Sequence, residues 1–197
     1  MRLRWLKIGR MDAGKARRRS GAASRALLAC AVLLLATAMP PMRAPGADAP
    51  LRVGEPAPAL VVPLLDGHVF DLAALRGKVV IVNFWATWCS PCRAEMPQLD
   101  AFYRRHRAQG LELLGVSVDD PTDRATVVRV MKSFSFPAAL AVAAKVNDFG
   151  APLAVPMTWI IDSRGIVRAR LVAGNAVTME SLAQAVLPLL PQATPAP

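Results

Sequence analysis

The run Val79–Trp85 ends just before a pair of cysteines, and this arrangement constrains the fold more than any other feature. The run reads VVIVNFW, and its β-branched and aromatic residues are apolar on both faces, as in a central strand of a covered sheet. Cys89 and Cys92 follow with C-x-x-C spacing, and residues 93–107 then show the polar and apolar pattern of an amphipathic helix. The two sulfurs are therefore expected where a buried strand passes into a helix.

The position of Cys89 predicts a reactive thiol. The first turn of a helix has free backbone N–H groups and carries the positive end of the helix dipole. A thiolate is stabilised there, so we expect the pKa of Cys89 to lie below the free value of about 8.5. Cys89 would attack a substrate disulfide, and Cys92, one turn later, would resolve the mixed disulfide. The chemistry needs no cofactor besides the Cys89–Cys92 disulfide itself.

Two other uses of a C-x-x-C pair fit the sequence less well. A purely structural disulfide with this spacing closes too small a loop to stabilise a fold much. A zinc site needs about four ligands, and only Cys30, His68 and His106 are available to complete one. Cys30 lies in an apolar N-terminal segment. We therefore expect no metal site.

The residues Phe84–Cys92 (FWATWCSPC) resemble the thioredoxin superfamily. The following Arg93–Pro97 (RAEMP) is similar to the TlpA-like and ResA-like branch, whose members are membrane-tethered or secreted bacterial thiol-disulfide oxidoreductases. The resemblance covers roughly residues 53–190. It implies an exported enzyme that reduces disulfides of specific client proteins, of the cytochrome c or copper-site maturation type. It also implies a membrane thiol-disulfide transporter as the electron donor.

The resemblance assigns a proton-transfer role to Glu95. ResA-like proteins have a buried carboxylate at this position that assists proton transfer at the thiols. Glu95 lies three residues after Cys92 and so shares a helix face with it. Thioredoxin uses an aspartate in the central strand for this task, and the matching Asn83 cannot take a proton. The alternative for Glu95 is a first-turn charge that is favourable with the helix dipole.

The resemblance and the local sequence also indicate residues that bind the client. Pro156 matches a proline that is cis in the superfamily and faces the dithiol, which leaves the backbone at Val155 free to pair with an extended substrate. Pro91 fixes φ in the first helical turn. Trp88 is expected to shield the sulfurs, with ordinary core packing as the alternative. Met157 departs from the usual threonine of the family.

The rest of the domain predicts an α/β, thioredoxin-like fold with a central mixed sheet covered by helices. Asp66-Gly67 is a strong hairpin turn, which predicts an added N-terminal β-hairpin. Strand and helix patterns then alternate. The expected strands are 59–64, 68–72, 79–85, 111–118, 136–142, 157–162 and 166–172, and the expected helices are 93–107, 123–134, 143–149 and 179–190.

Four segments are predicted along the chain: a signal peptide or N-terminal anchor at 1–38, a Pro/Ala-rich linker at 39–50, the thioredoxin-like domain at 51–190 and a disordered tail at 191–197. Residues 1–38 combine a basic stretch, an apolar run of 13 residues at 26–38 and a final Ala-Thr-Ala, which is typical of a secretory signal. An uncleaved segment would anchor the chain to the membrane, although a span needs about 20 apolar residues. We expect a periplasmic or otherwise extracytoplasmic location.

The charge distribution argues against a nucleic-acid partner. The chain carries a net charge of +10, but residues 1–38 hold nine Lys/Arg and one Asp, which leaves +2 for the rest. A nucleic-acid-binding domain would need a basic patch of its own.

Two other functions remain as alternatives. A copper-handling chaperone would use the two thiols as soft ligands, with Met96 or Met157 as a further ligand. A peroxidase of the peroxiredoxin type would need a threonine separated from its cysteine by two residues. Thr87 has only one residue between itself and Cys89.

Overall fold

The computed structural model describes residues 51–172 and 177–191. The predicted segments 1–38 and 39–50, and all of the predicted tail except residue 191, lie outside the described residues. Short 3₁₀ helices occupy Leu72–Leu75, Arg107–Gln109, Pro121–Asp123, Ala141–Ala143 and Leu187–Leu189. The α-helices are α2 (Ser90–His106), α3 (Arg124–Met131) and α4 (Met179–Val186). The strands are β1 (Leu60–Pro63), β2 (Val69–Asp71), β3 (Val79–Trp85), β4 (Leu111–Ser117), β5 (Ala138–Leu140), β6 (Val146–Asn147), β7 (Met157–Ile161) and β8 (Val167–Val172).

The central sheet has five strands in the order β5-β4-β3-β7-β8. Strands β3, β4 and β5 are parallel, whereas β7 and β8 run antiparallel to their neighbours. The sheet is therefore mixed, as the sequence predicts, and β3 lies at its centre. All seven residues of β3 are buried, which confirms the interpretation of this run as a strand covered on both faces.

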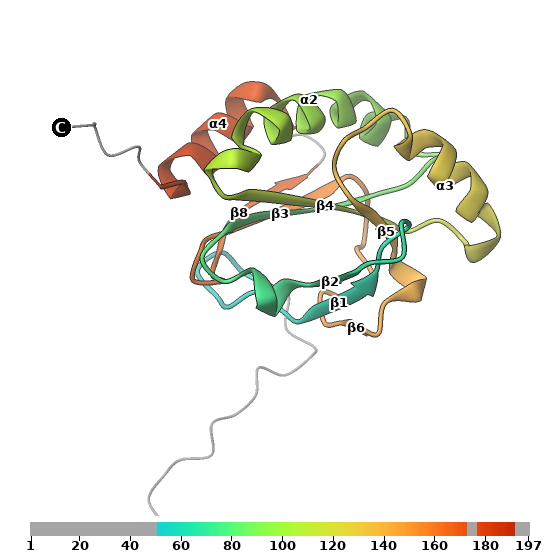
Figure 1. Cartoon of the computed structure of the whole chain (residues 1–197), viewed down its shortest axis with the longest axis horizontal. Coiled ribbons are helices and arrows are strands. Elements are labelled where there is room, and N and C mark those ends of the chain that lie inside the picture. The colour runs from blue at the N-terminus through green and yellow to red at the C-terminus, as the bar shows by residue number, and fades with distance from the viewer. Residues whose placement is uncertain (1–50, 173–176, 192–197) are drawn as a thin grey trace, which may run out of the picture. The chain divides into compact units, whose positions relative to one another are not determined.

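The two faces of the sheet are covered differently. Helices α2, α3 and α4 pack on one face, and the strands β1, β2 and β6 lie on the other (Figure 1). Successive residues of β3 alternate between the two sides: Ile81 and Trp85 belong to the core on the helix side, and Val82 and Phe84 to the core between the sheets. A small sheet, and not a second helix layer, thus covers the second face.

The predicted N-terminal hairpin is confirmed. Strands β1 and β2 pair antiparallel, with Pro63 opposite Val69, and the turn between them contains Gly67 at φ 94°. The hairpin is joined to the edge of the central sheet by a hydrogen bond of 2.8 Å from the N–H of Leu65 to the carbonyl of Ala138.

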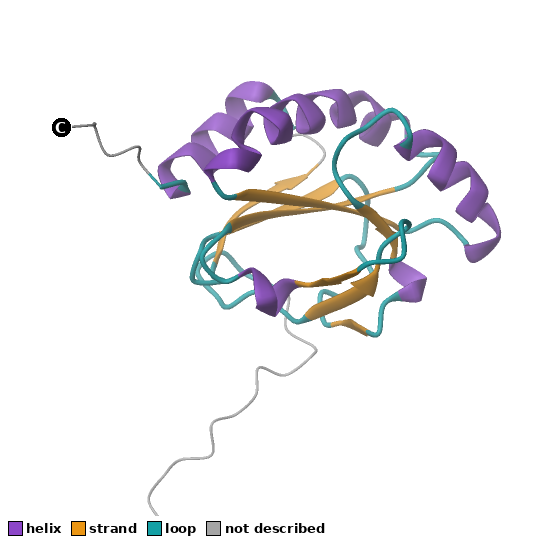
Figure 2. Cartoon of the chain, viewed as in Figure 1, coloured by secondary structure: helices purple, strands orange, loops and turns teal. Residues whose placement is uncertain are grey.

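The prediction of a helix at residues 143–149 is wrong. Val146 and Asn147 form the short strand β6, which pairs with Leu60 and Val61 of β1 and completes a three-stranded sheet (Figure 2). The edge of β1 offers backbone partners that a helix in this segment would leave unused, and this tertiary pairing outweighs the local preference of the segment. The helix expected at 123–134 is shorter, ending at Met131.

Helix α2 begins three residues earlier than the sequence pattern suggested, at Ser90. Pro91 occupies its first turn, where no N–H is needed. Both cysteines are therefore at the N-terminus of α2, directly after the turn that follows β3. Within the described part of the chain, none of the helices has the length and hydropathy of a membrane span.

Candidate active site

Cys89 is the residue that caps α2. Its backbone is extended, at φ −83° and ψ 100°, and its Sγ accepts a hydrogen bond of 3.2 Å from the N–H of Cys92. The two cysteines are joined in a disulfide. The contact between the Cys92 N–H and Cys89 Sγ places the first sulfur at the positive end of the helix dipole, where a thiolate would be stabilised in the reduced protein.

The two cysteines are buried, whereas the neighbouring tryptophan is exposed. Cys89 and Cys92 are 4% and 2% exposed, whereas Trp88 is 70% exposed. Trp88 is therefore not part of the core, and the core-packing alternative for this residue is wrong. An exposed tryptophan adjoining a buried redox pair is available to contact a partner, since large exposed aromatic side chains dominate many protein interfaces.

The strand register places Val155 and Pro156 at the same end of the sheet as the dithiol turn. Phe84 of β3 pairs with Met157 of β7, so the residues that continue these antiparallel strands lie at the same end of the sheet. The Val155–Pro156 peptide bond is cis, as the resemblance implied. Pro156 is buried and Val155 half-buried. Among the described residues, the segment 151–155 makes no backbone–backbone hydrogen bond.

Glu95 is a buried carboxylate on α2. It is 8% exposed, its Oε1 accepts a hydrogen bond of 3.2 Å from the N–H of Val177, and its Oε2 has no partner. Burial raises the pKa of the Glu95 carboxyl above its ordinary value, and the hydrogen bond from Val177 opposes this only in part. A buried carboxyl with a free oxygen is therefore present one helical turn from Cys92, as the resemblance implied.

Asn83 occupies the helix-side face of β3 and is also buried. Its side-chain amide donates a hydrogen bond of 2.8 Å to the hydroxyl of Thr158, its register partner in β7. This amide has no acidic proton to exchange at neutral pH. Glu95 is therefore the carboxylate that the structure offers near Cys92 on α2.

A second buried carboxylate, Asp119, was not identified from the sequence as a site residue. It follows β4 and is 3% exposed. Its oxygens accept hydrogen bonds from the N–H and hydroxyl of Thr87, at 2.9 and 2.6 Å, and from the hydroxyl of Ser117 at 2.6 Å. Because Thr87 is 32 residues away in sequence, no local pattern predicts this cluster. Only the parallel pairing of β3 with β4 brings the two loops together.

Comparison with known proteins agrees with this geometry. Residues 53–170 match the AhpC/TSA family. The chain belongs to this family.

Relatives of this AhpC/TSA protein are thiol-disulfide oxidoreductases. The thiol-disulfide oxidoreductase ResA of Geobacillus kaustophilus is 36% identical over 120 residues, which are 60% of this chain and 68% of the relative. A thiol:disulfide interchange protein of the thioredoxin family from Chlorobium tepidum has a TM-score of 0.58 at 25% identity, over 72% of this chain and 99% of that one. A secreted thiol-disulfide isomerase from Corynebacterium glutamicum has a TM-score of 0.57 at 25% identity, over 68% of this chain and 84% of that one.

The AhpC/TSA protein is thus a ResA-like thiol-disulfide oxidoreductase with a thioredoxin fold, as its sequence predicts. The geometry also bears on the peroxidase alternative. The hydroxyl of Thr87 donates to Asp119 at 2.6 Å. The Thr87 hydroxyl is therefore already used in a hydrogen bond to a carboxylate.

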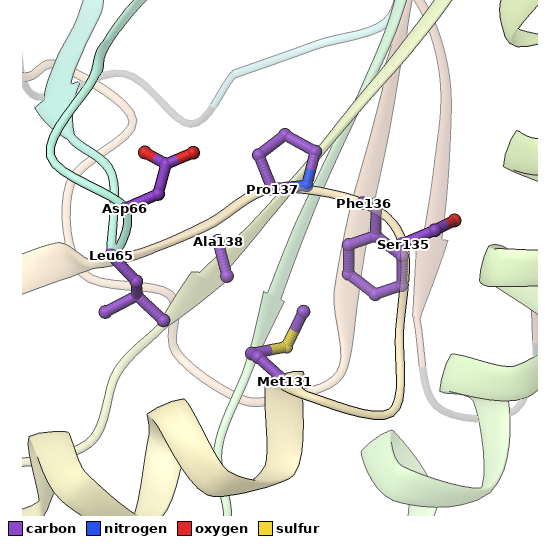
Figure 3. Close-up of a pocket in the computed structure, with 7 residues that line it drawn as sticks. All are labelled: Leu65, Asp66, Met131, Ser135, Phe136, Pro137 and Ala138. Atoms are coloured by element: carbon purple, nitrogen blue, oxygen red, sulfur yellow. The ribbon is translucent and has the colours of Figure 1, made fainter.

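One cavity of the described domain lies outside the predicted site. A cavity of about 310 Å³ lies between the hairpin turn, the end of α3 and the segment before β5 (Figure 3). None of its lining residues is a predicted site residue; they are Leu65, Asp66, Met131, Ser135, Phe136, Pro137 and Ala138. Among residues 51–172 and 177–191, no three His, Cys, Asp or Glu side chains are placed to hold a metal ion together.

Proposed function

We propose that this AhpC/TSA protein reduces disulfides of client proteins outside the cytoplasm, with Cys89 as the attacking thiol. The observation that carries the proposal is the contact of 3.2 Å from the N–H of Cys92 to the Sγ of Cys89 at the start of α2. This position favours the thiolate of Cys89, whereas Cys92 lies within the helix.

The reaction transfers two electrons in two exchange steps. The Cys89 thiolate attacks one sulfur of the client disulfide, and the other client sulfur leaves as a thiolate and takes a proton. Cys92 then loses its proton and attacks Cys89, which breaks the mixed disulfide and releases the second client thiolate. The client is left as a dithiol and this protein as the Cys89–Cys92 disulfide, with no further cofactor.

Glu95 is the proposed acceptor of the Cys92 proton. Its free Oε2 is buried, and a carboxyl whose pKa is raised is better matched to proton transfer near neutral pH than an ordinary surface glutamate. Cys92 must be deprotonated for the second step, and a carboxylate on the same helix face is positioned to assist.

The client is proposed to bind as an extended segment beside the dithiol. The backbone groups of residues 151–155, which make no backbone–backbone hydrogen bond to other described residues, would pair with it next to Val155 and Pro156. The exposed Trp88 would cover the other side of the client, and Pro91 shapes the first turn of α2. These residues recognise backbone and apolar surface more than a particular side chain.

The cellular setting is proposed from the N-terminal segment and the relatives. The basic and apolar pattern of residues 1–38 supports export, and one structural neighbour is a secreted protein. A membrane thiol-disulfide transporter would return the dithiol to its reduced form, and the N-terminal segment would hold the domain near that membrane if it is not cleaved. The proposed clients belong to cytochrome c or copper-site maturation.

The direction of electron flow is tested by redox equilibrium. The domain would be equilibrated with glutathione buffers, and the Cys89–Cys92 oxidation state measured by alkylation and mass spectrometry. We expect a potential nearer to that of thioredoxin, about −270 mV, than to that of the oxidant DsbA, about −120 mV. A potential at the DsbA end would contradict a reducing role. Two disulfide-bonded peptides would then be compared as substrates. One would carry C-x-x-C-H, the haem-attachment sequence of c-type cytochromes, and the other a copper-site dithiol sequence.

A further inference from the structure

We propose that Asp119 is a positioning residue for Cys89. Its carboxylate fixes the turn that leads into α2 and so holds the Cys89 sulfur against the helix N-terminus. The proposal rests on Cys89 being the attacking thiol. It adds a second acidic residue to the redox site, one that acts through the backbone and not by proton transfer.

Asp119 is buried at a cost that its contacts must offset. A carboxylate that is 3% exposed is unfavourable unless hydrogen bonds satisfy it. Oδ1 accepts from the hydroxyl of Thr87 at 2.6 Å, and Oδ2 accepts from the backbone N–H of Thr87 at 2.9 Å and from the hydroxyl of Ser117 at 2.6 Å. The N–H of Asp119 donates in turn to the Ser117 hydroxyl at 3.1 Å. Fully satisfied networks of this kind make a local structure rigid.

The structure held by this network is the turn that ends at Cys89. The N–H of Cys89 donates to the carbonyl of Ala86 at 3.1 Å, which closes a turn with Thr87 and Trp88 at its centre. The neighbouring Val118 N–H donates to the carbonyl of Trp85 at 2.9 Å. Asp119 thus accepts from both the backbone N–H and the side-chain hydroxyl of Thr87, a central residue of the turn. Strand β4 ends at Ser117, just before Asp119, and holds it in place.

The reactivity of Cys89 depends on where this turn places its sulfur. The Sγ atom lies 3.2 Å from the Cys92 N–H, and the stabilisation of a thiolate by a helix N-terminus falls off within the first turn. Loss of the anchor would leave two donors of Thr87 without their acceptor. We expect the turn to loosen, the sulfur to move from the helix N-terminus and the pKa of Cys89 to rise.

The test compares Asp119→Ala with Asp119→Asn in the reduced full-length protein. Both variants remove the charge, but asparagine keeps one of the two acceptor oxygens and alanine keeps neither, so the difference between the variants does not come from the loss of charge. The rate of Cys89 alkylation by iodoacetamide at pH 6.5 is followed by mass spectrometry. We expect the alanine variant to react at least about threefold more slowly than the asparagine variant, which corresponds to roughly half a pKa unit of thiolate population.

Asp100 provides the matched control. It is also a buried carboxylate, 5% exposed, and it accepts hydrogen bonds from the N–H and hydroxyl of Ser135 at 2.6 and 2.7 Å. It lies two turns beyond Cys92 on α2, and its partners among the described residues are Ser135 and Arg104, neither of which belongs to the Cys89 turn. Cys89 should be alkylated at the same rate in Asp100→Ala and Asp100→Asn. Equal rates for the two Asp119 variants, or the same ratio for the two Asp100 variants, would overturn the proposal.

Two further measurements keep the outcome interpretable. If Asp119→Ala does not fold, Thr87→Val and Thr87→Ser replace the Asp119 pair, because serine keeps the hydroxyl that donates to Asp119 and valine does not. The valine variant should react more slowly, and equal rates would again contradict the anchor. If wild-type Cys92 is alkylated before Cys89, the assignment of the attacking thiol fails, and this is visible before any variant is made.

Discussion

Replacing Glu95 by glutamine removes a base and changes little else at the site. Glu95 Oε1 accepts from the N–H of Val177 at 3.2 Å, and Oε2 is buried without a partner. Glutamine has the same size and keeps an oxygen for Val177. The substitution should therefore leave Cys89 and Cys92 in place while the proposed acceptor of the Cys92 proton is lost.

The expected loss is about tenfold in the rate of mixed-disulfide resolution. General-base catalysis contributes about 10²–10⁴-fold, but a thiol can also lose its proton to water, so we expect a value below that range. The difference should depend on pH. Burial raises the pKa of Glu95 above its ordinary value of 4.5, so wild type should approach the slow variant in acid, where the carboxyl is protonated. In alkali Cys92 ionises unaided, and the two rates should converge again.

The assay follows the mixed disulfide between Cys89 and a disulfide-bonded peptide by rapid quench and mass spectrometry from pH 6 to 8. Asp100→Asn is the control, since Asp100 is another buried carboxylate on α2. The reasoning is refuted if Glu95→Gln resolves the mixed disulfide at the wild-type rate across this range. It is also refuted if Asp100→Asn slows resolution equally.

The same substitution should stabilise the fold at neutral pH. The folded state holds the Glu95 proton more tightly than the unfolded chain, because burial raises the pKa. Wild-type stability from this group is therefore complete below the ordinary value of 4.5 and is lost as pH rises through the raised pKa. Glutamine has no proton to lose in this range, so Glu95→Gln keeps this stability as the pH rises. In urea denaturation, the free energy of unfolding of the variant minus that of wild type should therefore increase from pH 4 to pH 7. A decrease in this difference would contradict the burial argument.

Three further predictions concern the client surface, the core and the N-terminal segment. Trp88→Ala should weaken client-peptide binding about fivefold to tenfold. The unfolding free energy should change little, because Trp88 is 70% exposed. As a control, Val142→Ala, at another exposed apolar position with 61% exposure, should change neither quantity. Gly115→Ala should lower the free energy of unfolding in urea denaturation by about 1–3 kcal/mol, because a Cβ there would lie 3.0 Å from the Phe136 ring. An unchanged urea midpoint would show that the ring moves aside without cost. A fusion of residues 1–50 to a reporter that is active only in the periplasm should be active, whereas full-length chain recovered from the cytosol would exclude export.

Local patterns predicted the central elements because each has a strong local cause. The run Val79–Trp85 is buried throughout, so its composition alone identified a central strand. Asp66-Gly67 forms the hairpin turn because glycine tolerates the φ of 94° found at Gly67. The cysteine spacing and the following helical pattern then placed both sulfurs at the start of α2.

Features that depend on distant pairing were not predictable in the same way. Residues 143–149 have no strong pattern of their own, and the edge of β1 determines that Val146 and Asn147 form a strand. The neighbouring Asp120 caps the 3₁₀ helix that follows, by accepting from the N–H of Thr122 at 3.0 Å, whereas no local pattern marks Asp119 as a site residue. The contact of Asp119 with Thr87 follows from the pairing of Trp85 with Ser117, which no single-sequence pattern reveals.

The most direct test of the redox assignment compares Cys92→Ala with Cys89→Ala. Each reduced variant would be mixed with oxidised glutathione at pH 7, and the mixed disulfide followed by mass spectrometry. We predict that Cys92→Ala forms the adduct at Cys89 rapidly and retains it, because the resolving thiol one helical turn away is absent, whereas Cys89→Ala forms its adduct far more slowly. Faster adduct formation at Cys92 than at Cys89 would contradict the account.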